Sequence, residues 1–62
     1  MDDNQKVKKI NNEIEEKLKQ DGLTKKEIKN FRQRLYKIDC YYDSECMFEK
    51  SLLLECLKEM NE

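Results

Sequence analysis

Apolar side chains recur three or four residues apart along most of this chain, and that spacing is the period of an α-helix rather than of a β-strand. The two clearest runs are Val7, Ile10, Ile14 and Leu18, and then Ile28, Phe31, Leu35, Ile38 and Tyr42. The 62 residues include no proline and one glycine, so the usual markers of hairpins and long loops are missing. The sequence therefore predicts an all-α fold.

Two breaks divide the chain into three predicted helices. The predicted helices span residues 4–20, 24–41 and 44–60 of a single helical domain, residues 1–62. At the first break, Gly22 suits the left-handed position that follows a helix. Thr24 is then expected to cap the amide of Glu27, whose side chain returns to the Thr24 amide as a capping box. Either Asp43 or Ser44 can cap the third helix.

The third predicted helix is the most apolar part of the chain. Its apolar side chains cover a wide arc and are Cys46, Met47, Leu52, Leu53, Leu54, Cys56, Leu57 and Met60. An arc this wide suits a helix that packs against two neighbours, so a small three-helix bundle with this helix at its centre is expected. A bent helical hairpin, nearly continuous from Thr24 to Met60, remains open. Tyr42 and Phe48 are expected to cover the core near the second break.

The small size of the chain limits its stability. A core of this size supplies about 3–5 kcal/mol, and the first predicted helix offers only a narrow apolar stripe. We therefore expect this stripe to be buried in the bundle, in a homodimer or on a target, and we expect folding to be coupled to binding.

The three cysteines are Cys40, Cys46 and Cys56, an odd number, and residues 1–4 are unlike the start of a signal peptide. These features predict reduced thiols in a cytoplasmic protein. Cys46 and Cys56 are expected to be buried as small hydrophobic side chains, and Cys40 is the candidate for exposure. Structural zinc sites favour cysteines about two to four residues apart, a spacing that does not occur here. No metal and no other cofactor are expected.

The composition argues against catalysis and against a membrane span. Without histidine, no Ser/His or Cys/His relay can form, and a single glycine cannot build a glycine-rich phosphate loop. The many glutamates are expected to be solvated. No window reaches the roughly 18 apolar residues of a membrane-spanning helix. We therefore expect a protein that is not an enzyme and does not enter a membrane.

Charge is unevenly distributed along the chain. Residues 1–23 carry five basic and six acidic groups, residues 24–38 carry six and one, and residues 39–62 carry two and seven. The predicted partner-binding residues lie on one flank of the basic second helix and at its end, and are Lys25, Lys29, Arg32, Tyr36 and Tyr41. Three interpretations of the basic charge stay open. It faces water and the acidic third segment, it meets an acidic protein, or it binds nucleic acid, which the net charge of −1 disfavours.

These observations predict a non-catalytic, small helical regulator or inhibitor of the phage, antitoxin or anti-factor type, which masks a surface of a partner protein. The expected partner is another protein, with an acidic surface, and a homodimer is an open alternative. The other two functions that the sequence leaves open are a nucleic-acid-binding regulator that uses the basic second helix and a structural subunit of a larger complex.

Overall fold

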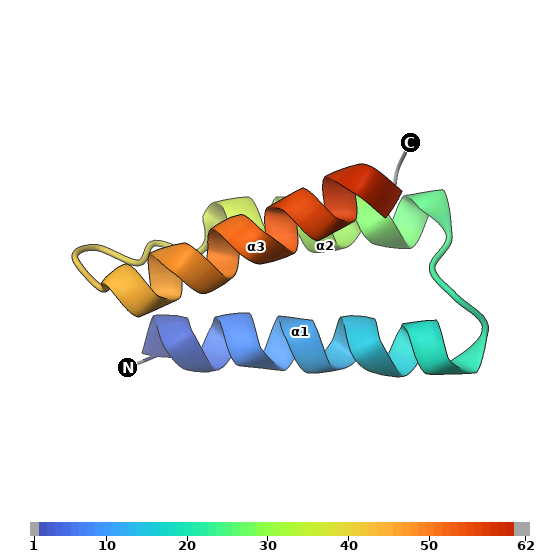
Figure 1. Ribbon diagram of the computed structural model, residues 1–62, viewed down its shortest axis with the longest axis horizontal. Coiled ribbons are helices and arrows are strands. Elements are labelled where there is room, and N and C mark those ends of the chain that lie inside the picture. The colour runs from blue at the N-terminus through green and yellow to red at the C-terminus, as the bar shows by residue number, and fades with distance from the viewer. Residues whose placement is uncertain (1, 61–62) are drawn as a thin grey trace.

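The computed structural model describes residues 2–60, which form three helices joined by two short turns. Helix α1 spans Asp2–Gln20, α2 spans Lys25–Lys37 and α3 spans Ser44–Met60. Each helix runs antiparallel to the one before it, and α3 lies beside both α1 and α2 (Figure 1). Residues 2–60 contain no strand. The predicted all-α three-helix bundle is confirmed, and the chain does not form the nearly continuous hairpin arm.

The turn between α1 and α2 follows the predicted signals closely. Gly22 adopts a left-handed φ of 80°, and its amide donates to the Lys17 carbonyl at 2.9 Å. The Thr24 hydroxyl accepts a hydrogen bond from the Glu27 amide at 3.1 Å and so caps α2. The Glu27 carboxylate accepts from the Thr24 hydroxyl at 3.3 Å, where a capping box would use the Thr24 amide. The Glu27 carboxylate also forms an ion pair with α1, in which the Lys17 ammonium lies 3.2 Å from one of its oxygens.

The core lies along the line where the three helices meet. It is formed by Val7, Ile10, Ile14, Ile28, Phe31, Leu35, Ile38, Cys40, Cys46 and Leu57, with Leu23, Leu53 and Leu54 packed against it. Helix α3 contacts both other helices, as its apolar arc predicts. Yet it buries only Cys46 and Leu57 fully, and much of its apolar surface stays exposed.

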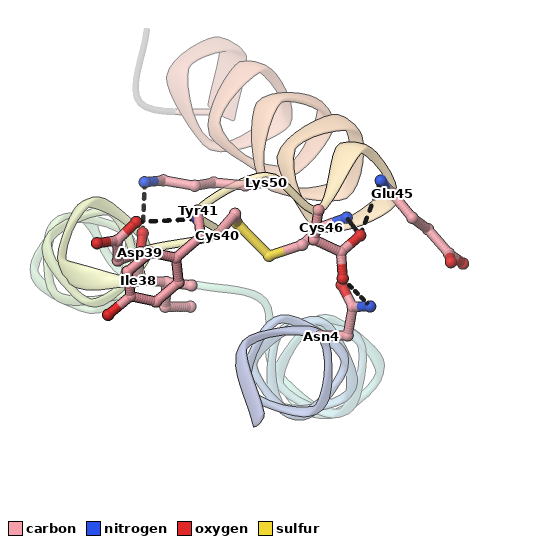
Figure 2. The surroundings of a disulfide bond; sticks show 9 residues. Asn4, Ile38, Asp39, Cys40, Tyr41, Glu45, Cys46 and Lys50 are labelled. Carbon is pink, nitrogen blue, oxygen red and sulfur yellow. Dashed lines mark hydrogen bonds between the residues drawn. A yellow bond between two sulfur atoms is a disulfide. The ribbon is translucent and has the colours of Figure 1, made fainter. Parts of the chain in front are cut away.

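The turn between α2 and α3 departs from the prediction. Helix α2 ends at Lys37, four residues before the predicted end, and Ile38 is its extended C-cap. Cys40 and Cys46 form a disulfide across the turn, with their Cα atoms 5.7 Å apart. The prediction of reduced thiols is wrong for this pair. A helix through residue 41 would have carried Cys40 along the α2 axis, whereas the early end turns it back toward α3 (Figure 2).

Polar contacts hold the same turn in place (Figure 2). One Asp43 carboxylate oxygen accepts from the amides of Glu45 and Cys46, both at 3.1 Å, and so caps α3. The other accepts from the Asn4 side chain at 2.7 Å, which ties the start of α1 to the start of α3. The Lys50 ammonium donates to the Ile38 carbonyl at 2.7 Å, beyond the end of α2. Of the two predicted caps for α3, Asp43 is the one used.

Within residues 2–60, none of the helices combines the length and the apolar character that crossing a bilayer requires.

Candidate functional site

The candidate site is the side of α2 that carries Lys25, Lys29, Arg32 and Tyr36, called the basic flank below. These residues are spaced by four, three and four, which keeps them on one side of a helix with about 100° per residue. Lys25, Lys29 and Tyr36 are exposed, and Arg32 is half-buried. Tyr41, the fifth predicted binding residue, is exposed in the turn that follows α2. The structure therefore leaves four of the five side chains open to solvent.

The basic flank lies on the α3 side of α2. The opposite side of α2 is identified by Glu27 and Arg34, because their partners, Lys17 and Glu13, belong to α1. The buried seam of Ile28, Phe31 and Leu35 separates the two sides and faces the core. The basic flank is therefore next to α3 but directed outward.

The acidic residues of α3 do not neutralise this flank. The two ion pairs found within residues 2–60 both join α2 to α1. Glu45, Glu55 and Glu59 are exposed on α3, and Glu49 lines a cavity shared with α1. Among residues 2–60 the basic flank therefore forms no ion pair with the third segment, and Lys25 and Lys29 face water. Glu49 and Glu59 line cavities that α3 shares with α1.

The ion pair between Arg34 and Glu13 fixes the other side of α2. The guanidinium donates to both carboxylate oxygens, at 2.6 and 3.3 Å, and lies 5.6 Å from the centre of the Phe31 ring. This hydrogen bonding lowers the pKa of Glu13 below its ordinary value of 4.5 and raises the pKa of Arg34. The hydrogen bond from Lys17 likewise lowers the pKa of Glu27. The Arg34 charge is thus paired with Glu13, whereas the cations of the basic flank form no ion pair within residues 2–60.

A cavity of about 310 Å³ lies beside Tyr41, near the end of the basic flank. Its walls include Met47 and Leu54 from α3 and the aliphatic stem of Lys50. Met47 is exposed, and the cavity is also lined by Asp39 and Lys50, so it combines an apolar wall with one charge of each sign. The sequence places Met47 in the apolar arc of the third helix and does not mark it as a surface residue. A flat or convex partner surface carrying carboxylates and one apolar side chain matches this arrangement.

Two aromatic residues expected to cover the core do not do so. Tyr42 is fully exposed, and Phe48 is 65% exposed. Tyr42 does not continue the apolar seam of α2, because the helix ends at Lys37 and Tyr41 adopts a left-handed φ of 51°. Phe48 lies on the side of α3 away from Cys46 and Leu57. That prediction is wrong, and both rings belong to the surface.

The cysteine predictions also need correction. Cys40 and Cys46 are both buried in the disulfide, so Cys40 is not the exposed cysteine. Cys56, expected to be buried, is the exposed free thiol. Across residues 2–60, no three cysteine or carboxylate side chains come together in an arrangement that could hold a metal ion.

A second concentration of positive charge lies between α1 and α2. A cavity of about 300 Å³ there is lined by Lys6, Lys9, Arg34 and Lys37. Arg34 reaches Glu13 from this position, and the charge of Lys9 also acts on Glu13 and helps to lower its pKa. The sequence reasoning missed this cleft because its residues come from two helices whose mutual orientation the spacing does not specify.

The chain matches no protein-family model, no curated protein sequence and no solved structure.

Proposed function

We propose that this protein is a small, non-catalytic helical regulator or inhibitor that binds another protein and masks an acidic surface of that partner. It is of the kind exemplified by phage-encoded inhibitors, antitoxins and anti-factors. One observation supports this proposal above the others. The basic flank of α2 points outward without an ion-pair partner among residues 2–60, while Arg34 on the opposite side is paired.

The chemistry of the flank favours a protein partner. Lysine and arginine set the rate of encounter with an acidic surface and fix its orientation. Tyr36 and Tyr41 add rigid amphipathic rings, a side-chain type that carries much of the energy in protein interfaces. The cavity beside Tyr41 offers a recess of mixed lining, with Met47 and Leu54 as its apolar part and Asp39 and Lys50 as its charged part. Charge for recognition and an aromatic anchor are therefore adjacent.

The non-catalytic part of the proposal rests on the amino-acid content. The chain has no histidine to act as a general base and one glycine, at the turn before α2. The cytoplasmic location stays a prediction, and the Cys40–Cys46 disulfide weighs against it, because disulfides form and persist in oxidising compartments.

The decisive experiment compares affinity isolation from the native cell with three baits. Wild type, Arg32→Glu and Lys6→Glu are captured side by side, and helicity is measured for each by circular dichroism. Arg32 lies on the basic flank and Lys6 on the α1–α2 cleft, so the two substitutions make the same charge change on different sides. We expect a protein that is retained by wild type and Lys6→Glu and lost with Arg32→Glu. Equal retention by all three folded baits would contradict the proposal.

The α1–α2 cleft favours one second candidate, a nucleic-acid-binding regulator, because its lysines could contact consecutive phosphates. In this case affinity for a nucleic acid falls steeply with salt and is lost with Lys6→Glu, whereas Arg32→Glu has the smaller effect. The same three proteins therefore distinguish the two functions. A captured multi-subunit assembly that ignores both substitutions indicates the third alternative, a structural subunit.

A further inference from the structure

An apolar groove runs along the side of the bundle where α1 and α3 meet, away from the basic flank. Two cavities form it, of about 450 and 300 Å³, and they share Asn11, Leu53 and Cys56 in their walls. The two helices diverge toward their C-terminal ends (Figure 1), where the larger cavity lies. The groove is therefore a continuous feature along α3.

The α3 wall of this groove carries exposed apolar side chains. Leu52, Cys56 and Met60 follow one another every four residues on α3, and Leu18 from α1 lines the larger cavity together with Cys56 and Met60. All four are exposed. The row exists because the apolar residues of α3 span about 260° of its circumference, more than two narrow helical seams can cover. Part of the α3 arc is thus left without a partner among residues 2–60.

These apolar side chains form one exposed patch. Leu18, Leu52 and Met60 are 45%, 50% and 39% exposed, and Cys56 lies between Leu52 and Met60 along α3. Contiguous apolar patches of this kind mark binding surfaces on soluble proteins.

The charges beside the groove select a second copy of this chain as that partner. Glu49 and Glu59 come from α3, and Lys8 comes from α1. A partner surface that is entirely positive is repelled by Lys8, and one that is entirely negative is repelled by Glu49 and Glu59. A second copy related by a twofold axis along the groove lays its α1 over the first copy's α3. Since Lys8 and Glu49 line the same cavity, each Lys8 then faces Glu49 of the other copy.

We propose that two copies of the chain associate through the α1–α3 groove as a twofold-symmetric dimer, with Cys56 beside the axis. Residues near the axis of such an interface meet their own copies. Cys56 lies in the walls of both cavities, where the two join midway along the groove. The basic flanks lie on another side of each bundle and stay free, so the dimer presents two of them.

Sedimentation equilibrium and thiol cross-linking test this dimer together. Cys56 is the free cysteine, so a short bismaleimide reports its distance from a second Cys56 and needs no reducing agent that would open the disulfide. We expect a concentration-dependent dimer and a cross-linked species of twice the chain mass. A monomeric mass up to millimolar concentration, or a dimer that resists the cross-linker, would overturn the proposal.

Two exposed apolar residues of α3 form a matched pair for mutation. Leu52 is 50% exposed and lines the groove, whereas Met47 is 52% exposed and lines the cavity beside Tyr41. Leu52→Glu places a charge at two positions of a twofold interface, one from each copy. We therefore expect the dissociation constant of the dimer to rise about 100-fold or more. Met47→Glu should leave it unchanged. Equal effects of the two substitutions, with native helicity in both, would show that the groove is not the interface.

A charge exchange keeps the test decisive if Leu52→Glu perturbs the fold. Lys8→Glu and Glu49→Lys should each weaken the dimer about tenfold. The double variant should recover the wild-type dissociation constant, because the pairs are restored with opposite sign. Additive weakening in the double variant would exclude the twofold arrangement along the groove.

Discussion

Reduction of the Cys40–Cys46 disulfide should remove about half of the stability of this bundle. The bridge closes a short loop, with a sequence separation of six. The chain-entropy relation gives about 2.3 kcal/mol for a loop of this length at 25 °C. A small core of this kind supplies about 3–5 kcal/mol in total. With a urea dependence of about 1 kcal/mol per molar, the unfolding midpoint should fall by about 2 M.

Urea unfolding followed by circular dichroism tests this value. The protein is unfolded and refolded with and without a phosphine reductant, in a Cys56→Ser background that prevents exchange with the free thiol. Cys40 is 6% exposed and Cys46 is fully buried, so reduction is carried out in the unfolded state and equilibrium is approached from there. A midpoint shift of less than about 0.5 M would show that the turn is held by its hydrogen bonds and packing instead.

Three further perturbations have definite expected outcomes. Leu57→Ala should cost about 2–5 kcal/mol and leave the chain largely unfolded, because Leu57 is buried between the helices, whereas Leu52→Ala should cost much less; thermal unfolding measures both. Thr24→Ala removes the cap on the Glu27 amide and should cost about 1 kcal/mol in the same assay. The pKa of Glu13 is lowered by folding, so its contribution is present above pH 4.5 and is lost as the pH falls through the folded-state value. Arg34→Ala should flatten that part of the pH dependence of urea stability.

Local signals in the sequence were enough to predict the helices and most of the core. Ile28, Phe31 and Leu35 are buried as the seven-residue pattern predicts, and Gly22 and Thr24 form the first turn. These features depend on spacing and on capping chemistry, which a single sequence carries directly.

The second turn could not be predicted in the same way. The apolar pattern continues through Ile38 and Tyr42, and no proline or glycine stops the helix. The disulfide and the cap from Asp43 take precedence over the local preference for helix, and both depend on where α3 begins relative to α2. The wrong placement of Tyr42 follows from the same cause.

The candidate site was only partly visible in the sequence. Helical spacing placed Lys25, Lys29, Arg32 and Tyr36 together on one flank. It could not show that the acidic groups of α3 lie elsewhere, because that depends on how α3 is rotated against its neighbours. For the same reason, the sequence predicts Leu52 and Cys56 to be part of the core arc. A narrow apolar stripe fixes the rotation of a helix, but the wide arc of α3 does not, so packing decides which part of it is buried.

The positions of the tyrosines have a practical consequence for optical measurements. The chain has no tryptophan, and Tyr36, Tyr41 and Tyr42 are all exposed in the folded state. Unfolding therefore changes their surroundings little, and tyrosine emission should be nearly constant across a denaturation curve. A protein that covers Tyr36 and Tyr41 changes that emission strongly. The native chromophores thus report the arrival of a partner without a contribution from folding, and no label is needed.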